Sequence, residues 1–232
     1  MILEICANSY QSAINAEIAG AHRIELCSEI SVGGITPSLG LLKKVMHSLH
    51  IPVQVLIRPR SGDFHYSNAE FDIMKENILQ SKELGCAGIV SGVLHANNTI
   101  DIKRTRELIE LSKPLSFTFH RAFDVVPKPK ESLLELIKMG VGRLLTSGQE
   151  EKAENGINLL IELQKLAKNK LTILPGGGIN SKNCIHFKNT GFTEIHSSAS
   201  KTTSRNTHSY FGNTPQTVSD VDTIKNMLDT IA

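Results

Sequence analysis

Short runs of β-favouring apolar residues alternate with longer amphipathic segments along most of the chain. This alternation is typical of parallel sheets whose strands are connected by helices. Eight strand segments are predicted, at residues 2–6, 23–27, 53–57, 88–93, 115–120, 143–146, 171–174 and 193–196. Eight consecutive βα units predict an α/β fold of the (β/α)8 TIM-barrel type, and 232 residues suit a single domain over residues 1–232.

Helix-capping patterns fall between the strand segments and support this interpretation. Ser67-x-x-Glu70 and Ser147-x-x-Glu150 both have the spacing of a capping box, which marks the start of a helix. The alternative fold is an open doubly wound sheet, but no G-x-G-x-x-G sequence follows the first strand. The barrel is therefore the predicted fold.

One polar segment, residues 202–216, interrupts the alternation before the last helix. It contains Gly and Asn and is predicted to form a long loop. Loops of this length either bind ligands or act as lids, or they are simple excursions over the surface. The sequence leaves both interpretations open.

Composition and charge limit the classes of partner. The net charge of +2 at pH 7 is too small to predict nucleic-acid binding. No apolar run approaches the roughly 20 residues of a membrane span, so we expect no membrane partner. The four cysteines form no C-x-x-C pair, and the N-terminus leads directly into a strand rather than a signal peptide. Reduced thiols and a cytoplasmic location are expected.

Ionisable side chains gather at the predicted carboxyl ends of the strands, where TIM barrels place their active sites. Since strand side chains alternate with period two, Glu4 and Cys6 share one face of the first strand. Glu25 and Cys27 share one face of the second strand in the same way. The other strand ends contribute Arg58, Arg60, Asp63, His120, Arg121, Asp124 and His196. These groups could form a structural ion-pair plug, but so many ionisable groups at one end favour a functional site.

Glycine and serine residues follow the last two predicted strands. Gly176, Gly177 and Gly178 end the seventh strand, and Ser197 and Ser198 end the eighth. In TIM barrels these two loops frequently hold a phosphate through backbone N–H groups. The sequence therefore predicts a site for a phosphate or a carboxylate.

Such a site suits an enzyme that acts on a small phosphorylated or carboxylated metabolite. Arg58 and Arg60 would clamp the anion, and Glu4 and Glu25 would offset the two arginines when no anion is bound. Glu25 or His120 would transfer protons, with Glu4 as a third candidate catalytic residue. No Lys lies on a predicted inward strand face, which argues against Schiff-base chemistry.

The two cysteines on the first strands suggest a different activity. Cys6 and Cys27 could bind a soft cation such as Cu(I) in two-coordinate fashion. Alternatively, they are small apolar side chains that are simply buried. A hard-metal site from Glu4, Glu25 and His196 is conceivable, but we expect no cofactor other than Cu(I).

Six motifs together resemble the CutC family. They are Arg23-Ile24-Glu25-Leu26-Cys27, Gly33-Gly34-x-Thr36-Pro37-Ser38, Arg58-Pro59-Arg60-x-Gly62-Asp63-Phe64-x-Tyr66, Thr118-Phe119-His120-Arg121-Ala122-Phe123-Asp124, Leu145-Thr146-Ser147-Gly148 and Gly176-Gly177-Gly178-Ile179. The resemblance implies a TIM barrel, a cytoplasmic protein and a role in copper homeostasis, with Cys6 and Cys27 as the Cu(I) ligands. It extends to about Ser198 and implies nothing about residues 202–216.

Two functions are therefore expected from this sequence. The first is a copper-homeostasis protein that binds Cu(I). The second is an enzyme for a small anionic metabolite, in which the copper role is indirect or absent. In either case the partner is a copper ion or a small anion, and we expect a homodimer or a higher homo-oligomer.

Overall fold

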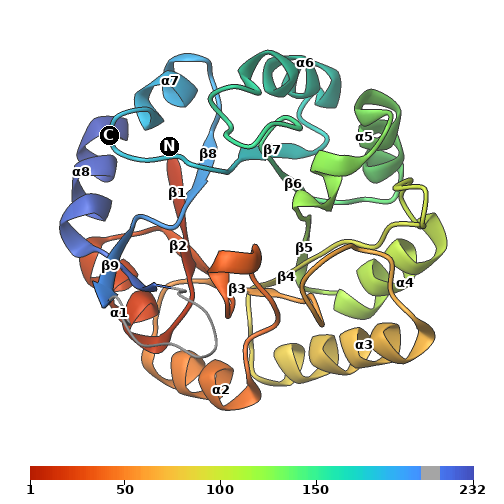
Figure 1. The fold of residues 1–232 in the computed structure, drawn as a ribbon, viewed down its shortest axis with the longest axis horizontal. Helices are drawn as coiled ribbons and strands as arrows, with labels where there is room; N and C mark the ends of the chain where they lie inside the picture. The colour runs from red at the N-terminus through yellow and green to blue at the C-terminus, as the bar shows by residue number, and fades with distance from the viewer. Residues whose placement is uncertain (205–214) are drawn as a thin grey trace.

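Eight parallel strands form one sheet that curls into a nearly closed barrel in the computed structural model, which describes residues 1–204 and 215–232 (Figure 1). The strands are β1 (Ile2–Ala7), β2 (Arg23–Leu26), β3 (Val53–Leu56), β4 (Gly88–Ser91), β5 (Ser116–Phe119), β6 (Arg143–Thr146), β7 (Thr172–Pro175) and β8 (Glu194–Ser197). Their order is β7-β6-β5-β4-β3-β2-β1-β8, and a parallel bridge between Gly176 and His196 joins the two edge strands. The predicted single-domain TIM barrel is confirmed.

A ring of helices surrounds the strands (Figure 1). The α-helices of the described ranges are α1 (Tyr10–Ala19), α2 (Leu39–Ser48), α3 (Asn68–Glu83), α4 (Ile102–Ser112), α5 (Pro129–Lys138), α6 (Ile157–Ala167), α7 (Cys184–Asn189) and α8 (Val221–Ile231). Two short 3-10 helices, η1 (Ile30–Val32) and η2 (Arg121–Val125), follow β2 and β5. The capping box of Ser67 and Glu70 is confirmed at the start of α3. None of these helices combines the length and the apolar character needed to cross a bilayer.

The strands have two different faces, as period-two alternation requires. On β1, Leu3, Ile5 and Ala7 are fully buried in the large apolar core shared with the helices. Cys6 instead belongs to a small apolar cluster with Cys27, Leu56 and Val90. The two faces of β1 therefore pack in two separate apolar clusters.

Charged side chains fill the barrel at the amino ends of the strands. The group formed by Glu4, Arg23, Arg143 and Glu194 is called the barrel floor below. The Arg23 guanidinium bridges Glu4 and Glu194, and Arg143 Nε lies 3.2 Å from Glu194 Oε2. Parallel pairing places Arg23 directly opposite Glu4, so this contact follows from the register of β1 and β2. An ion-pair network therefore fills the amino ends of the barrel, whereas the plug considered from the sequence lay among the groups at the carboxyl ends.

A two-stranded hairpin replaces part of the loop that was predicted at residues 202–216. Strands β9 (Ser200–Ser204) and β10 (Gln216–Ser219) pair antiparallel, so both ends of the predicted loop lie in strands. Their Thr and Val residues favour extended backbone, which explains why these ends form strands rather than a loop. Residues 205–214 of the predicted loop lie outside the described residues. Asn15 Nδ2 of α1 donates to the Ser219 carbonyl at 2.8 Å and holds the hairpin against the barrel.

The barrel floor predicts a stability effect. Arg23→Met removes the cation that neutralises two buried carboxylates, so we expect the free energy of unfolding to fall by about 3–5 kcal/mol. Urea denaturation near neutral pH measures this change. Arg60→Met is the matched control, because Arg60 forms surface ion pairs with Asp63 and Glu70 that contribute about 1 kcal/mol or less. Equal losses in the two variants would show that the floor adds no special stability.

Candidate functional site

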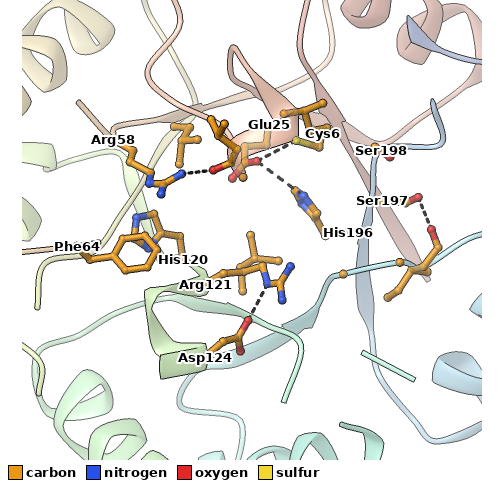
Figure 2. A pocket seen from close by; sticks show the side chains of 18 of the residues that line it. Cys6, Glu25, Arg58, Phe64, His120, Arg121, Asp124, His196, Ser197 and Ser198 are labelled. Atoms are coloured by element: carbon orange, nitrogen blue, oxygen red, sulfur yellow. Dashed lines mark hydrogen bonds and ion pairs between the residues drawn. The ribbon is translucent and has the colours of Figure 1, made fainter. Parts of the chain in front are cut away.

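A cavity of about 420 Å³ opens at the carboxyl ends of the barrel strands (Figure 2). Most of the predicted site residues line it. They are Cys6, Glu25, Arg58, His120, Arg121, Asp124, Gly177, Gly178, His196, Ser197 and Ser198. The strand ends of the barrel therefore bring together side chains from six of the eight βα units.

The other five predicted site residues lie elsewhere. Glu4 is one layer deeper in the barrel, and Cys27 is fully buried in the small apolar cluster. Gly176 forms the bridge that joins β7 to β8. Arg60 and Asp63 form an ion pair near the start of α3, outside the lining of the cavity.

Arg58 is held by backbone carbonyl groups. Its Nη1 donates to the carbonyls of Val32 and Gly34, both at 2.8 Å, and its Nη2 donates to the Gly62 carbonyl at 2.9 Å. The guanidinium also lies over the Phe64 ring, 4.9 Å from its centroid. These contacts fix the loops after β2 and β3 around the cavity.

The predicted compensation of Arg58 and Arg60 by Glu4 and Glu25 is wrong. Within the described ranges no carboxylate pairs with Arg58, and Arg60 pairs at the surface. Glu4 is already engaged by Arg23 of the barrel floor. Period-two alternation predicts that both Glu4 and Arg58 point into the barrel. It does not predict their depth along the barrel axis, and Glu4 lies deeper than Arg58.

A row of polar contacts runs from the floor into the cavity. Glu4 Oε1 lies 2.7 Å from His196 Nδ1, and His196 Nε2 lies 3.7 Å from Glu25 Oε2. Cys6 Sγ donates to the same Glu25 oxygen at 3.4 Å. Figure 2 shows Cys6, Glu25 and His196 facing one another across the cavity floor.

The two carboxyl groups in this row differ in how readily they ionise. Burial alone would raise the pKa of Glu4, but the hydrogen bond from His196 and the charge of Arg23 lower it to about 2. Burial raises the pKa of Glu25, and the neighbouring Glu4 adds to that shift against the effect of His196. Burial lowers the pKa of His196, yet Glu25 and Glu4 raise it overall. Glu4 is therefore ionised, and Glu25 is the carboxylate that takes up a proton more readily.

His120 is a neutral imidazole with one free nitrogen. Its Nδ1 accepts a hydrogen bond from the Ala122 backbone N–H at 3.2 Å and caps η2, so the proton of the neutral ring is on Nε2. Burial, reinforced by the charge of Arg58, lowers the pKa of His120 to about 3. His120 thus presents an N–H donor to the cavity near neutral pH.

Three buried polar atoms around the cavity have no hydrogen-bond partner among the described protein groups. They are Glu25 Oε1, Arg58 Nε and His120 Nε2, in side chains that are only 4–5% exposed. Buried polar atoms in folded proteins are nearly always paired, because an unpaired one costs about 1–3 kcal/mol. One acceptor and two donors, all in residues that line the cavity, therefore have no protein partner within the described ranges.

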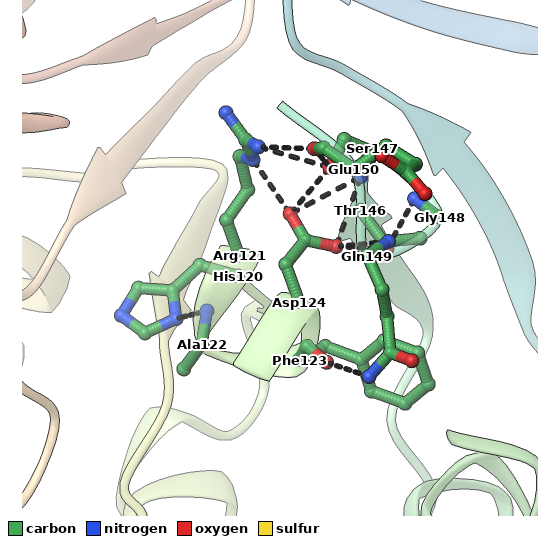
Figure 3. A network of polar contacts seen from close by, with 10 residues as sticks. All are labelled: His120, Arg121, Ala122, Phe123, Asp124, Thr146, Ser147, Gly148, Gln149 and Glu150. Atoms are coloured by element: carbon green, nitrogen blue, oxygen red, sulfur yellow. Dashed lines mark hydrogen bonds and ion pairs between the residues drawn. The ribbon is translucent and has the colours of Figure 1, made fainter. Parts of the chain in front are cut away.

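A second network fixes Arg121 at the rim of the cavity (Figure 3). Arg121 Nε lies 2.7 Å from Asp124 Oδ2, and its Nη2 donates to Ser147 Oγ at 2.9 Å. Asp124 accepts further hydrogen bonds from the Ser147 N–H at 3.0 Å and from Thr146 Oγ1. Ser147 was not a predicted site residue, although it lies in a motif of the family resemblance.

The predicted capping box at Ser147 and Glu150 is wrong. Helix α6 begins at Ile157, and Ser147 Oγ binds Asp124 and the Glu150 carbonyl instead. The Ser147 hydroxyl binds Asp124, which is distant in the sequence, instead of capping a helix as the local pattern predicts.

Gly177 makes room for Arg121. A Cβ atom at Gly177 would lie 3.3 Å from Arg121 Nη1 and 3.2 Å from Ser147 Cβ, and the glycine has a φ of +116°. A larger side chain would therefore be both strained and crowded. The glycine loop after β7 and the Arg121 guanidinium form one wall of the cavity.

The two predicted thiol ligands lie in contact. Cys6 Sγ and Cys27 Sγ are 3.5 Å apart, and all four cysteines of the chain are free thiols. The hydrogen bond with Cys27, burial and the nearby Glu25 raise the pKa of the Cys6 thiol well above its usual range. The sulfur atoms are thus close enough to share one metal ion, provided that Cys6 loses its proton.

His120 predicts a specific pH dependence. Unfolded histidine takes up a proton near pH 6.5, but native His120 does so only near pH 3, so stability falls as pH falls between these values. When the pH is lowered from about 7.5 to about 4.5, the free energy of unfolding of the wild type should fall. In His120→Asn this fall should be smaller by about 2–3 kcal/mol. The Asn side chain keeps an oxygen that can cap η2. His196 makes an opposite contribution to the pH dependence of stability, but it is present in both proteins, so that contribution cancels in the comparison.

Urea unfolding at the two pH values measures this difference. His47→Gln, which removes an exposed histidine of α2, is the control and should follow the wild type. An equal pH dependence in His120→Asn and wild type would mean that His120 is not held neutral.

Comparison with known proteins places the chain in a family. The family model described as CutC family matches residues 1–201. A family protein CutC from Enterobacter sp. (strain 638) is 45% identical over 202 residues, which cover 87% of this chain and 81% of that protein. The human protein named copper homeostasis protein cutC homolog is also 45% identical over 202 residues, covering 87% of this chain and 74% of the human one. A crystal structure of CutC from Streptococcus agalactiae matches with a TM-score of 0.81 and 35% identity, covering 85% of this chain and 98% of that one. The chain belongs to the CutC family.

Proposed function

We propose that the cavity binds a small anionic metabolite and transfers protons on it. The observation that carries this proposal is that Glu25 Oε1, Arg58 Nε and His120 Nε2, in three residues lining one cavity, are buried and have no hydrogen-bond partner among residues 1–204 and 215–232. The volume of about 420 Å³ lies in the usual range of ligand pockets. Two donors and one acceptor match a ligand that carries both an anionic group and a hydroxyl or acidic proton.

The anionic group is assigned to the wall formed by Arg121 and the glycine loop. Arg121 is oriented by Asp124 and Ser147, so its guanidinium needs little reorganisation to bind an anion. Gly177 lies against this guanidinium and allows close backbone approach, and Ser198 also lines the cavity. Arg58 lies across the cavity and supplies a second cationic donor.

Proton transfer is assigned to Glu25. Burial raises the pKa of this carboxyl group, and a raised carboxyl pKa favours a group that both accepts and donates a proton. His120 donates a hydrogen bond from its neutral Nε2–H to charge that develops on the substrate. Glu4 acts as a positioning residue, because its carboxylate holds the His196 ring beside Glu25.

Anion binding is tested by the thermal stability of the protein. Phosphate, sulfate or a sugar phosphate at about 100 times its Kd should stabilise the wild type by about 2.7 kcal/mol and raise its Tm. Arg121→Gln should lose most of this ligand-induced shift, and Gly177→Val should lose it completely, because valine would displace the guanidinium. Each variant is compared with its own ligand-free Tm.

Arg106→Gln is the control for a general loss of positive charge, since Arg106 is exposed on α4 and does not line the cavity. It should retain the full shift. The proposal is wrong if no anion stabilises the wild type, or if Arg121→Gln responds as the wild type does.

A second function is supported by the sulfur geometry. The human and mouse relatives carry the name copper homeostasis protein cutC homolog, and we propose that this chain also serves copper homeostasis, by binding Cu(I). The contact of Cys6 Sγ and Cys27 Sγ at 3.5 Å suits a two-thiolate site after a small separation of the sulfurs. Such a site requires reduced thiols, which fits the proposed cytoplasmic location.

Cu(I) binding is tested by anaerobic titration against a chromophoric Cu(I) chelator. The wild type should bind about one equivalent tightly, and Cys27→Ser should lose it because one thiolate alone is a poor site. Cys184→Ser is the matched control, since Cys184 is equally buried but lies on α7. Undiminished binding by Cys27→Ser would exclude the thiol pair as the copper site.

A further inference from the structure

Three different metal-ligating side chains converge at the base of the cavity, from three adjacent strands. The Cys6 sulfur, a Glu25 carboxylate oxygen and a His196 ring nitrogen all lie within 4.8 Å of one another. We propose that Cys6, Glu25 and His196 form a site for a divalent cation of borderline softness, such as Zn²⁺, whose fourth coordination position opens into the cavity. Neither of the functions proposed above requires this metal.

The distances between the ligand atoms fit tetrahedral coordination. Cys6 Sγ lies 3.4 Å from Glu25 Oε2, and His196 Nε2 lies 3.7 Å from the same oxygen. A tetrahedral site with bonds of about 2.0–2.3 Å has edges of about 3.3–3.8 Å. The third pair, Cys6 Sγ and the His196 ring nitrogen, lies within 4.8 Å, so a small side-chain rotation would close the three ligands around the cation.

Glu4 supplies the support that a histidine ligand requires. Its Oε1 lies 2.7 Å from His196 Nδ1, so the proton of the neutral ring is held on Nδ1 and the Nε2 lone pair faces Glu25. Arg23 fixes Glu4 from the other side. Carboxylate–histidine–metal arrangements of this kind orient the ring and increase its basicity in many zinc sites.

The donor set balances the charge of a divalent cation. A Cys6 thiolate and a Glu25 carboxylate contribute two negative charges, and His196 is neutral as a ligand. The combination of thiolate, imidazole and carboxylate is typical of Zn²⁺ and its neighbours rather than of Mg²⁺ or Ca²⁺. Cys27 is not part of this set, which distinguishes it from the two-thiolate Cu(I) site.

The arrangement has the form of a catalytic rather than a structural zinc site. Three protein ligands leave one position for water or substrate, and all three line the cavity (Figure 2). The unpartnered Nε of Arg58 and Nε2 of His120 belong to the same cavity. A metal in this place would polarise a carbonyl or acidify a bound water beside the groups that hold an anion.

The test uses the purified full chain after treatment with a chelator. Titration with Co²⁺, a spectroscopic substitute for Zn²⁺, should show about one equivalent with a thiolate-to-cobalt charge-transfer band, and Zn²⁺ should displace it. Cys6→Ser and Glu25→Gln should weaken binding by more than about 100-fold, and Glu4→Gln by about 10–100-fold as a positioning residue. Cys27→Ser is the control and should retain both the band and the affinity.

A measurement on the wild type keeps the test valid if a variant does not fold. Zn²⁺, but not Mg²⁺, should raise the Tm of the chelator-treated wild type, and X-ray absorption of the bound zinc should show one sulfur ligand. The proposal is overturned if Co²⁺ gives no thiolate band, or if bound Zn²⁺ shows no sulfur ligand. It is also overturned if Cys27→Ser loses the metal while a folded Glu25→Gln retains it.

Discussion

The Glu4 carboxylate connects the barrel floor to the cavity. One of its oxygens binds Arg23 of the barrel floor, and the other binds His196 at the base of the cavity. Burial opposes ionisation, but these two partners together lower the pKa of Glu4 to about 2, so the charge persists at physiological pH. The fixed charge orients His196, and it also makes ionisation of Glu25 harder. Removing the floor would therefore change the protonation of the cavity as well as the stability of the barrel.

The two ends of the barrel differ in how completely their charges are paired. At the floor, arginines and glutamates alternate and satisfy one another. At the cavity, Arg58 is held by carbonyl groups that carry no net charge, and one oxygen of Glu25 has no partner in the part of the chain that the structure describes. Folding tolerates such unpaired atoms only when the surrounding structure determines them strongly. The barrel provides that constraint, and the residues that carry these unpaired atoms line the cavity.

The sequence predicted the barrel and the face of each strand residue, because alternation with period two is a local property. It also identified the capping box of Ser67, whose two partners are close in the chain. The sequence did not predict side-chain contacts whose two partners are distant in the chain. Ser147 has the same local pattern, yet its hydroxyl binds Asp124, which no spacing rule reveals. The pairing of Glu4 with Arg23 depends on strand register, and the depth of a residue in a barrel follows from register rather than from alternation.

Cys6 occupies the position on which the competing metal sites depend. Its sulfur lies 3.5 Å from Cys27 Sγ and 3.4 Å from Glu25 Oε2, so it can belong to a soft two-thiolate pair or to a mixed triad. As a terminal ligand the Cys6 thiolate would bind one ion, so it would complete one of the two proposed sites at a time. A soft monovalent ion would favour the buried sulfur of Cys27, and a borderline divalent ion would favour the carboxylate and the imidazole. The choice of metal would then decide whether Glu25 remains free to move protons, which links any copper role of this barrel to the chemistry of its cavity.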